Sequence, residues 1–215
     1  MVKIFLFLIV FLLSTSIINS QNRISLNVGY GYYLSNSENS TKIMGDNKFR
    51  SFVLYDFSYQ RDRLFGFNLL FEYSYQEITK NNIIEFIRYN PGPNPSPPPY
   101  WGNMKLINHN FDLDYTANIN KYLSYGIGPS FIIANRILEV DTILYDKLAS
   151  SGLGVNGFAE LSIPIYGSRK YVFFTSKLKF RYTYSIWFDK GIRNLDGYHQ
   201  EFFTAQILAG IGYAF

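Results

Sequence analysis

Three basic residues stand at alternate positions in one short segment of the sequence: Lys177, Lys179 and Arg181. In a β-strand such residues share a face, because side chains alternate with a period of two. Six more charged residues fall on the matching face of other predicted strands: Arg50, Asp56, Glu72, Asp112, Asp114 and Glu160. Charges taken out of water must pair and hydrogen-bond, since an isolated buried charge is very costly. The pattern predicts an ion-pair network in which residues 171–186 face residues 63–77 and 104–119.

Acyl-transfer chemistry would need a serine within reach of a histidine that an acid orients. The sequence has two histidines. His109 lies between two asparagines with no serine two positions later, and His199 has Glu201 close by but no serine. Two isolated histidines also disfavour a transition-metal site. We therefore expect no enzymatic activity, no cofactor and no metal, with His109 at a membrane interface and His199 solvated.

The segments that position these residues alternate apolar and polar side chains, which is typical of half-buried strands. Aromatic residues make up 19% of the chain and charged residues only 17%. The alternation predicts eight strands, at residues 24–34, 48–60, 63–77, 104–119, 122–135, 152–165, 171–186 and 201–215. Globular strands are usually about 5–6 residues long, whereas a tilted strand needs roughly 9–11 residues to cross a membrane.

Short and long connections alternate along the chain. Polar or glycine-containing turns are expected at residues 61–62, 120–121 and 166–170, and long loops at residues 35–47, 78–103, 136–151 and 187–200. Consecutive antiparallel hairpins of this kind close as an up-and-down meander. An even number of strands places both termini at the end that carries the short turns.

The second long loop contains a proline-rich run from Pro91 to Pro99. Such a run favours an extended polyproline II conformation and resists regular strand pairing. The simpler interpretation is a stiff surface loop. The alternative is a recognition element, because aromatic side chains follow the pre-ordered run. Its candidate residues are Pro97, Pro98, Pro99, Tyr100 and Trp101.

The N-terminal residues differ from the rest of the chain. Lys3 precedes an apolar run over residues 4–13, and small and polar residues follow over 14–20. These are the parts of a secretory signal peptide, and the apolar run is shorter than the roughly 20 residues of a membrane-spanning helix. We expect a signal peptide at residues 1–20 and one barrel domain at residues 21–215. The absence of cysteine excludes a disulfide framework, and a net charge of +4 without a basic run does not suggest nucleic acid.

The face opposite the charged residues is almost wholly apolar or aromatic. In the last predicted strand it consists of Phe203, Ala205, Ile207, Ala209, Ile211, Tyr213 and Phe215. A basic residue on a lipid-facing position costs about 2–4 kcal/mol at mid-membrane, and the four basic residues together would cost on the order of 10 kcal/mol, similar to a domain's whole stability. The charged face must therefore point into the barrel and the aromatic face toward lipid.

The final strand resembles the C-terminal signal of bacterial outer-membrane β-barrels, with a terminal aromatic, Phe215, and apolar residues before it at Phe203, Ile207, Ile211 and Tyr213. The mature chain resembles the small eight-stranded outer-membrane class, such as OmpA- and OmpX-like transmembrane domains. That resemblance implies an outer-membrane location with periplasmic termini. It also implies assembly by periplasmic chaperones and the barrel-assembly machinery, outer-membrane lipids as partners, and a monomer.

Fold class does not determine activity, because one barrel architecture serves several tasks. An eight-stranded barrel is only just wide enough for its inward side chains to fill it, so the near balance of charges predicts a plugged lumen. The leading interpretation is a structural or adhesin-like protein whose loops bind an extracellular ligand. A narrow pore for ions or small solutes is the first alternative. A lipid A-modifying enzyme and a soluble carrier are further alternatives.

Overall fold

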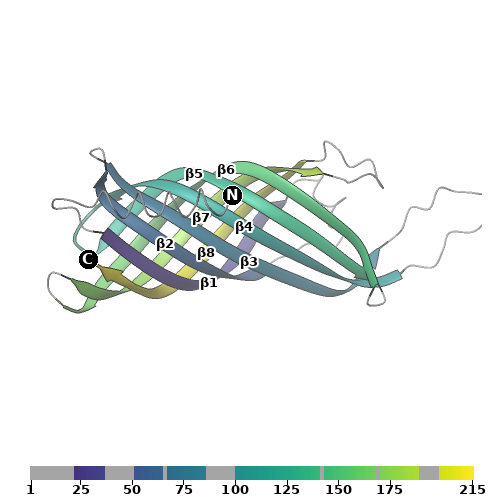
Figure 1. Cartoon of the computed structure of the whole chain (residues 1–215), viewed down its shortest axis with the longest axis horizontal. Helices are drawn as coiled ribbons and strands as arrows, with labels where there is room; N and C mark the ends of the chain where they lie inside the picture. Colours follow the sequence, from purple (N-terminus) through teal and green to yellow (C-terminus); the bar gives the residue numbers. More distant parts are fainter. Residues whose placement is uncertain are drawn as a thin grey trace, which may run out of the picture.

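The computed structural model describes residues 22–36, 51–64, 67–85, 100–140, 143–167, 170–188 and 199–215. They form eight strands: β1 (Asn22–Asn36), β2 (Ser51–Leu64), β3 (Phe67–Glu85), β4 (Tyr100–Asn118), β5 (Leu123–Val140), β6 (Ile143–Tyr166), β7 (Tyr171–Phe188) and β8 (His199–Ala214). Each strand pairs antiparallel with its neighbour in sequence, and β8 pairs with β1 to close the barrel (Figure 1). The predicted all-β, eight-stranded up-and-down barrel is confirmed. Among these residues no helix is long and apolar enough to span a lipid bilayer.

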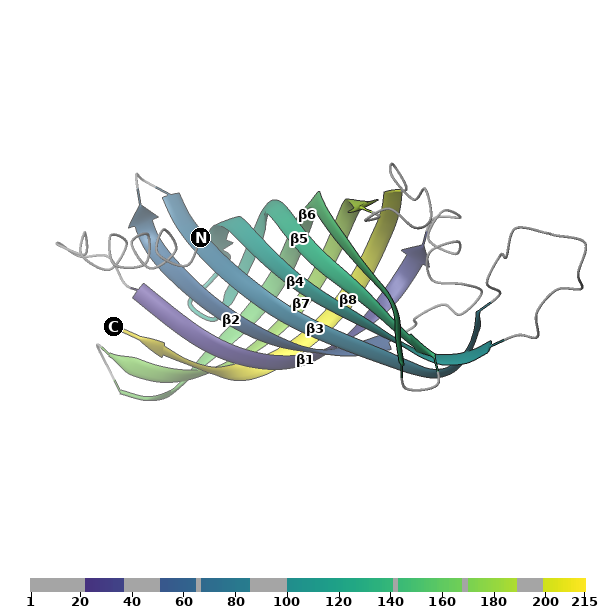
Figure 2. The same cartoon turned by 45° about the vertical axis from the view of Figure 1, so that its right-hand side comes forward.

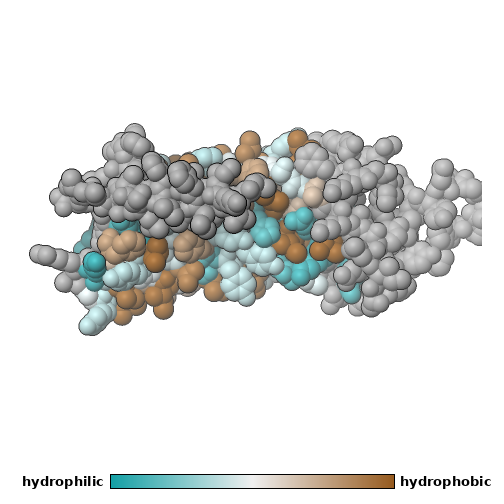
Figure 3. Space-filling model, viewed as in Figure 1, coloured by the Kyte–Doolittle hydropathy of each residue, from teal (hydrophilic) through white to brown (hydrophobic). Residues whose placement is uncertain are grey.

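Side chains alternate between the lumen and the outer wall along most of each strand. Along β7, Lys177, Lys179 and Arg181 are buried, while the residues between them are exposed. Aliphatic residues on the outer wall are strongly exposed, at 70% for Leu153 and 68% for Leu26. Figure 3 shows hydrophobic side chains along the part of the outer wall in view. A water-soluble barrel would have the reverse arrangement, so the predicted orientation of the two faces is confirmed and the outer wall suits lipid.

The turn after β2 lies later in the chain than the sequence predicts. Residues 61–62 were expected to form that turn, yet β2 continues to Leu64, and Leu64 pairs with Phe67. The ladder shifts register between Arg61 and Leu64. Arg61 is buried beside Tyr59, which explains why a polar pair typical of turns is accommodated inside a strand. The predicted start of the next strand at residue 63 is wrong for the same reason.

Four strands extend well beyond their predicted ends on the side of the long loops. Residues 78–85 and 100–103 were expected to be loop but belong to β3 and β4, and residues 136–140 and 143–151 belong to β5 and β6. The expected ends coincide with Glu77 and Lys105, where charges first appear on the outer wall. Backbone pairing does not stop there, because an antiparallel ladder satisfies its hydrogen bonds in water as well as in lipid.

These extensions form a four-stranded sheet, β3–β6, that projects past the other strands. Pairing of β3 with β2 reaches Glu77, while pairing of β3 with β4 continues to Glu85. On the other side, β6 pairs with β7 only as far as Ala149 among the described residues, but it pairs with β5 to Ile143. Figure 2 shows these strands reaching farther than β1, β2, β7 and β8. We call residues 78–85, 100–105, 137–140 and 143–148 the projecting sheet.

The start of β1 and the last residue of the chain meet at the opposite end of the barrel. The backbone N–H of Asn22 donates to the carbonyl of Phe215 at 2.9 Å, and the N–H of Phe215 donates back to Asn22 at the same distance. The ring of Phe215 stacks on Tyr213 with centroids 5.9 Å apart. Phe215 therefore closes the seam between β1 and β8. The predicted signal peptide at residues 1–20 lies outside the described residues.

Candidate functional site

The lumen contains a cluster of charged side chains that reach across the barrel from opposite walls. Nζ of Lys177 on β7 lies 2.6 Å from Oε2 of Glu72 on β3 and 3.2 Å from Oε2 of Glu160 on β6. The contact with Glu160 is between strand neighbours, because Glu160 and Lys177 are register partners in the β6–β7 ladder. The contact with Glu72 crosses the lumen. Lys177 therefore connects the two walls of the barrel.

Two carboxylates on neighbouring strands are held together by basic residues from β7. Glu72 and Asp112 stand directly opposite each other in the β3–β4 ladder, an arrangement that repels when no cation intervenes. Lys179 binds Glu72 and lies 2.5 Å from Oδ2 of Asp112. Arg181 also binds Asp112 through Nη2, and the same Nη2 donates to Oγ of Ser74 at 3.2 Å. The basic residues of β7 thus neutralise both acids.

Burial makes these contacts strong constraints on the structure. The side chains of Lys177 and Lys179 are fully enclosed, and Glu72, Asp112 and Arg181 are almost so. Breaking such a pair by removing one partner typically costs about 3–5 kcal/mol, because the other charge stays buried and uncompensated. The same cluster would be a poor path for ions, since each of its three basic residues is already bound to a carboxylate.

Two of the predicted lumen acids lie in the cluster without forming a salt bridge among the described residues. Asp56 on β2 accepts a hydrogen bond from Nδ2 of Asn27 at 2.7 Å. Asp114 on β4 is wholly buried and makes no ion pair in this part of the chain. The remaining predicted member, Arg50, lies outside the described residues.

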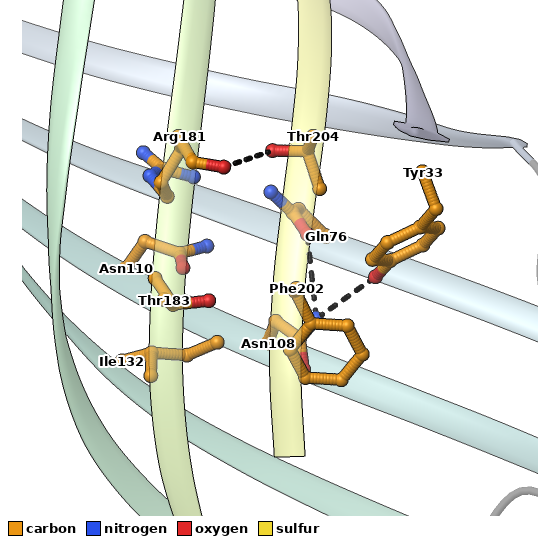
Figure 4. Close-up of a pocket in the computed structure, with 9 residues that line it drawn as sticks. All are labelled: Tyr33, Gln76, Asn108, Asn110, Ile132, Arg181, Thr183, Phe202 and Thr204. Atoms are coloured by element: carbon orange, nitrogen blue, oxygen red, sulfur yellow. Dashed lines mark hydrogen bonds between the residues drawn. The ribbon is translucent and has the colours of Figure 1, made fainter. Parts of the chain in front are cut away.

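An aromatic group covers the cluster on the side of the long loops. The ring of Tyr33 lies 5.0 Å from Phe52 and 5.4 Å from Phe202 between centroids, and all three are buried. Nδ2 of Asn108 donates to the Tyr33 hydroxyl at 3.4 Å. Tyr33, Asn108, Phe202 and Arg181 are among the residues that line a cavity of about 10 Å³, and Figure 4 shows their side chains. A volume of that size holds about one water molecule, so the lumen is filled at this level.

Another set of aromatic residues encloses the cluster from the side of the short turns. Nζ of Lys177 lies 4.8 Å from the centre of the Phe158 ring, a cation–π contact. Phe173 is also buried, and its ring fills the space over Gly212, where a Cβ would come within 2.2 Å of the ring. Glycine is needed there because the ring and the strand approach so closely.

These enclosing aromatic residues are the functional feature that the sequence interpretation missed. Phe52 and Phe202 occupy lumen-facing positions of their strands, in step with the lumen charges. Tyr33 directly follows the outward-facing Tyr32 and therefore also faces the lumen. The sequence did contain a signal for them. Large rings occupy the alternate positions that otherwise carry polar residues, near the ends of β1, β2 and β8 that adjoin the long loops. Such positions are where a barrel interior can be closed by side chains.

On the outer wall, His109 belongs to a polar and aromatic ladder on β3 and β4. Its Nδ1 lies 2.9 Å from the Tyr73 hydroxyl, and its ring lies 5.5 Å from that of Tyr75. The Tyr75 hydroxyl donates to Glu77 at 2.5 Å, and Nζ of Lys105 lies 2.7 Å from Oε1 of Glu77. Hydrogen bonds from Lys105 and Tyr75 lower the pKa of Glu77, which lies beyond the tyrosines at the edge of the apolar wall. This ladder suits a membrane interface.

The candidate loop element is only partly described. Pro97, Pro98 and Pro99 lie outside the described residues. Tyr100 and Trp101 were expected to lie in a loop, and this prediction is wrong. The two residues begin β4, where Tyr100 pairs with Glu85 and Trp101 with Ile84. Strand pairing starts directly after the proline run because the aromatic pair again has backbone donors to offer.

The C-terminal residues with the proposed assembly pattern lie on the outer wall of β8. Their exposed side chains are those of Phe203, Ile207, Ile211 and Tyr213. They form one continuous apolar row that ends at Phe215. The row is placed where lipid, or a protein that recognises an unassembled strand, can reach it.

A closed eight-stranded barrel with a charged, filled lumen and an apolar outer wall is a small transmembrane β-barrel. Solved structures share this fold. Ail, the attachment invasion locus protein of Yersinia pestis in complex with the heparin analogue sucrose octasulfate, matches with a TM-score of 0.50 and 11% identity over 90% of this chain and 99% of Ail. The outer membrane protein OprG from Pseudomonas aeruginosa has a TM-score of 0.45 and 10% identity over 91% and 96% of the two chains. Neisserial surface protein A has a TM-score of 0.43 and 10% identity over 91% and 98%.

The chain therefore has the fold of the small eight-stranded outer-membrane β-barrels, as its sequence resemblance implies. No family model matches the sequence, and no curated protein matches it. At these identities the likeness shows the fold, and the function must be argued from the residues of this chain.

Proposed function

We propose that this protein is an outer-membrane surface barrel whose lumen is plugged and whose projecting sheet binds a ligand outside the cell. The observation that carries the proposal is the extension of β3–β6 beyond the described ends of their neighbours β2 and β7. In the described ladders, β3 and β6 each lack a strand partner on one side over this extension, and a strand edge with free backbone groups can bind another chain.

The plugged lumen supports a surface role over a pore. Lys177 and Lys179 are held by carboxylates from β3, β4 and β6, and the rings around Tyr33 cover them. A solute path through the barrel would require these contacts to break together. The narrow pore is therefore the weaker candidate. The name of Ail, an attachment invasion locus protein, is a precedent for a surface role on this fold.

The proposal that the protein lacks enzymatic activity rests on the surroundings of His109. Its described partners are the Tyr73 hydroxyl and aromatic rings. They include no serine, threonine or cysteine for the histidine to activate and no carboxylate to orient it for acyl transfer. We propose that His109 and its neighbours anchor the barrel at the outer interface, where amphipathic rings are favoured.

The recognition role can be tested with cells that display the full barrel and a trimmed variant. In the variant, residues 79–103 and 138–148 are replaced by short turns, so that β3–β6 end level with β2 and β7. A matched control carries a substituted short turn at residues 120–121. We expect the full barrel and the control to bind surfaces coated with fibronectin, laminin, collagen or heparin, and the trimmed barrel to remain folded but lose that binding. Equal binding by the trimmed barrel, or no binding by the full barrel, would contradict the proposal.

A further inference from the structure

Among the residues that the structure describes, the charges in the centre of the lumen do not balance. Three carboxylates there pair with three cations, in the contacts given above. Asp56 and Asp114 are additional, with 3% and 0% of their surface exposed. Two other buried cations, Arg61 and Arg136, lie near opposite ends of the barrel and have their own partners. If every acid were ionised, the central cluster would hold two uncompensated negative charges.

Asp56 faces groups that cannot stabilise a second negative charge. On the β1 side, Asn27 donates to Oδ1 of Asp56. Oδ2 has no donor among the described residues, and the neighbouring carboxyl group is that of Glu72 on β3. Lys177 and Lys179 of β7 face Asp56 but are bound to Glu72. Two carboxyl groups this close do not both ionise, because like charges in contact repel strongly.

Asp114 is surrounded in a similar way. Neither of its oxygens meets a donor in good geometry in the part of the chain that the structure describes. The amide of Asn156 on β6 lies beside it, yet Nδ2 of Asn156 donates to a β5 backbone carbonyl at 3.4 Å, and Oδ1 of Asn156 also lacks a donor. The charged groups that face Asp114 are Asp112 on β4, Glu72 on β3 and Lys179 on β7. Lys179 is already bound to both of those acids.

We propose that Asp56 and Asp114 each bind a proton in the folded barrel, so that the central cluster is electrically neutral. A proton on Asp56 supplies the donor missing from its contact with Glu72. A proton on Asp114 supplies the donor missing beside Asn156. The two acids form a proton-binding pair inside the plug, which goes beyond the recognition role and does not depend on it.

The number of protons bound in the folded and the unfolded states sets the direction in which stability changes with pH. In the unfolded chain both acids release their protons near pH 4, the ordinary range of aspartate. The folded barrel keeps them, so it binds more protons than the unfolded chain above that pH. The contribution of these two acids to stability is therefore fully present below about pH 4 and falls as the pH rises, until the folded acids also ionise. The folding equilibrium constant should fall about tenfold for each pH unit and each retained proton.

The test measures reversible unfolding of the full barrel in liposomes from about pH 5 to pH 8, for the wild type and four neutral variants. Asp56→Asn and Asp114→Asn should fold better than the wild type at pH 7, because neither variant has to take up a proton at that position. Each substitution should also reduce the pH dependence of the folding equilibrium constant by about tenfold per pH unit. Glu72→Gln and Asp112→Asn are the matched controls. They should lower the folding equilibrium constant at pH 7, because each leaves a buried cation without its partner.

A wild-type barrel whose stability does not change over this range would overturn the proposal. So would stability that depends on the concentration of Na⁺ or Ca²⁺ at constant pH, since a bound cation would then balance the charge. Infrared spectroscopy gives a readout that does not require the variants to fold. The wild type should show the carbonyl band of protonated carboxylic acids in an apolar site, and the absence of that band would also contradict the proposal.

Discussion

Lys177 and Glu72 are 105 residues apart in the chain, and Nζ of the lysine lies 2.6 Å from Oε2 of the glutamate across the barrel lumen. A contact of this kind can form only after the barrel closes, because β3 and β7 are not neighbours in the sheet. The ion-pair cluster therefore reports on closure of the whole barrel. Its strength should appear in global unfolding rather than in local fraying.

Replacing Lys179 with methionine should destabilise the barrel strongly. The substitution keeps most of the side-chain volume but leaves Glu72 and Asp112 facing each other without the cation between them. We expect a loss of about 3–5 kcal/mol in the free energy of unfolding, measured by urea titration in liposomes. Lys105→Met is the control, because Lys105 pairs with Glu77 at the exposed edge. That change should cost less than about 1 kcal/mol, and equal losses for the two variants would contradict the account.

Introducing arginine on the outer wall should be costly in proportion to membrane depth. Leu113 is exposed on the outer wall of β4, between Tyr115 on the side of the short turns and His109 on the side of the long loops. This position is near mid-membrane. Leu113→Arg should reduce the free energy of unfolding by about 2–4 kcal/mol in lipid bilayers. Ile119→Arg, at the β4–β5 turn, is the matched control and should have an effect of about 0–1 kcal/mol. Similar costs at both positions would mean that the apolar wall does not lie in the membrane.

Phe215→Ala should separate assembly in cells from stability of the finished barrel. The backbone bonds between residue 215 and Asn22 do not depend on the ring, which contributes a single stacking contact with Tyr213. We expect purified variant protein to refold into liposomes with nearly unchanged stability. Insertion into the outer membrane of cells should fall severalfold, if the barrel-assembly machinery reads the terminal aromatic. Normal insertion in cells would remove the basis for an assembly role.

Strand alternation made most of the fold predictable. The period of two is a local property, so Lys177 and Lys179 could be assigned to the lumen and Leu178 to the lipid side without knowledge of the register. Strand ends were less predictable, because the projecting sheet continues into water where the apolar wall has ended. At Arg61, a polar pair resembling a turn lies within β2 because the arginine is buried beside Tyr59.

The internal arrangement of the lumen could be predicted only in part. The alternation of side chains along each strand assigns Asp56, Glu72 and Asp112 to the barrel interior. Which of these acids meets a cation depends on the stagger between β3 and β7 when the barrel closes. Sequence reasoning therefore could not separate the bridged Glu72 from the unpaired Asp56. The ring of Phe202 was missed because the interior was expected to be polar throughout.

The central claim is that the lumen is plugged, and single-channel recording tests it most directly. Purified barrel is refolded and inserted into planar lipid bilayers in concentrated KCl. Because Lys177, Lys179 and Arg181 are bound to carboxylates and the Tyr33 cavity has room for about one water molecule, we predict a baseline without stable steps. Uniform, long-lived conductance steps that scale with the KCl concentration would show a continuous path and contradict the plugged lumen.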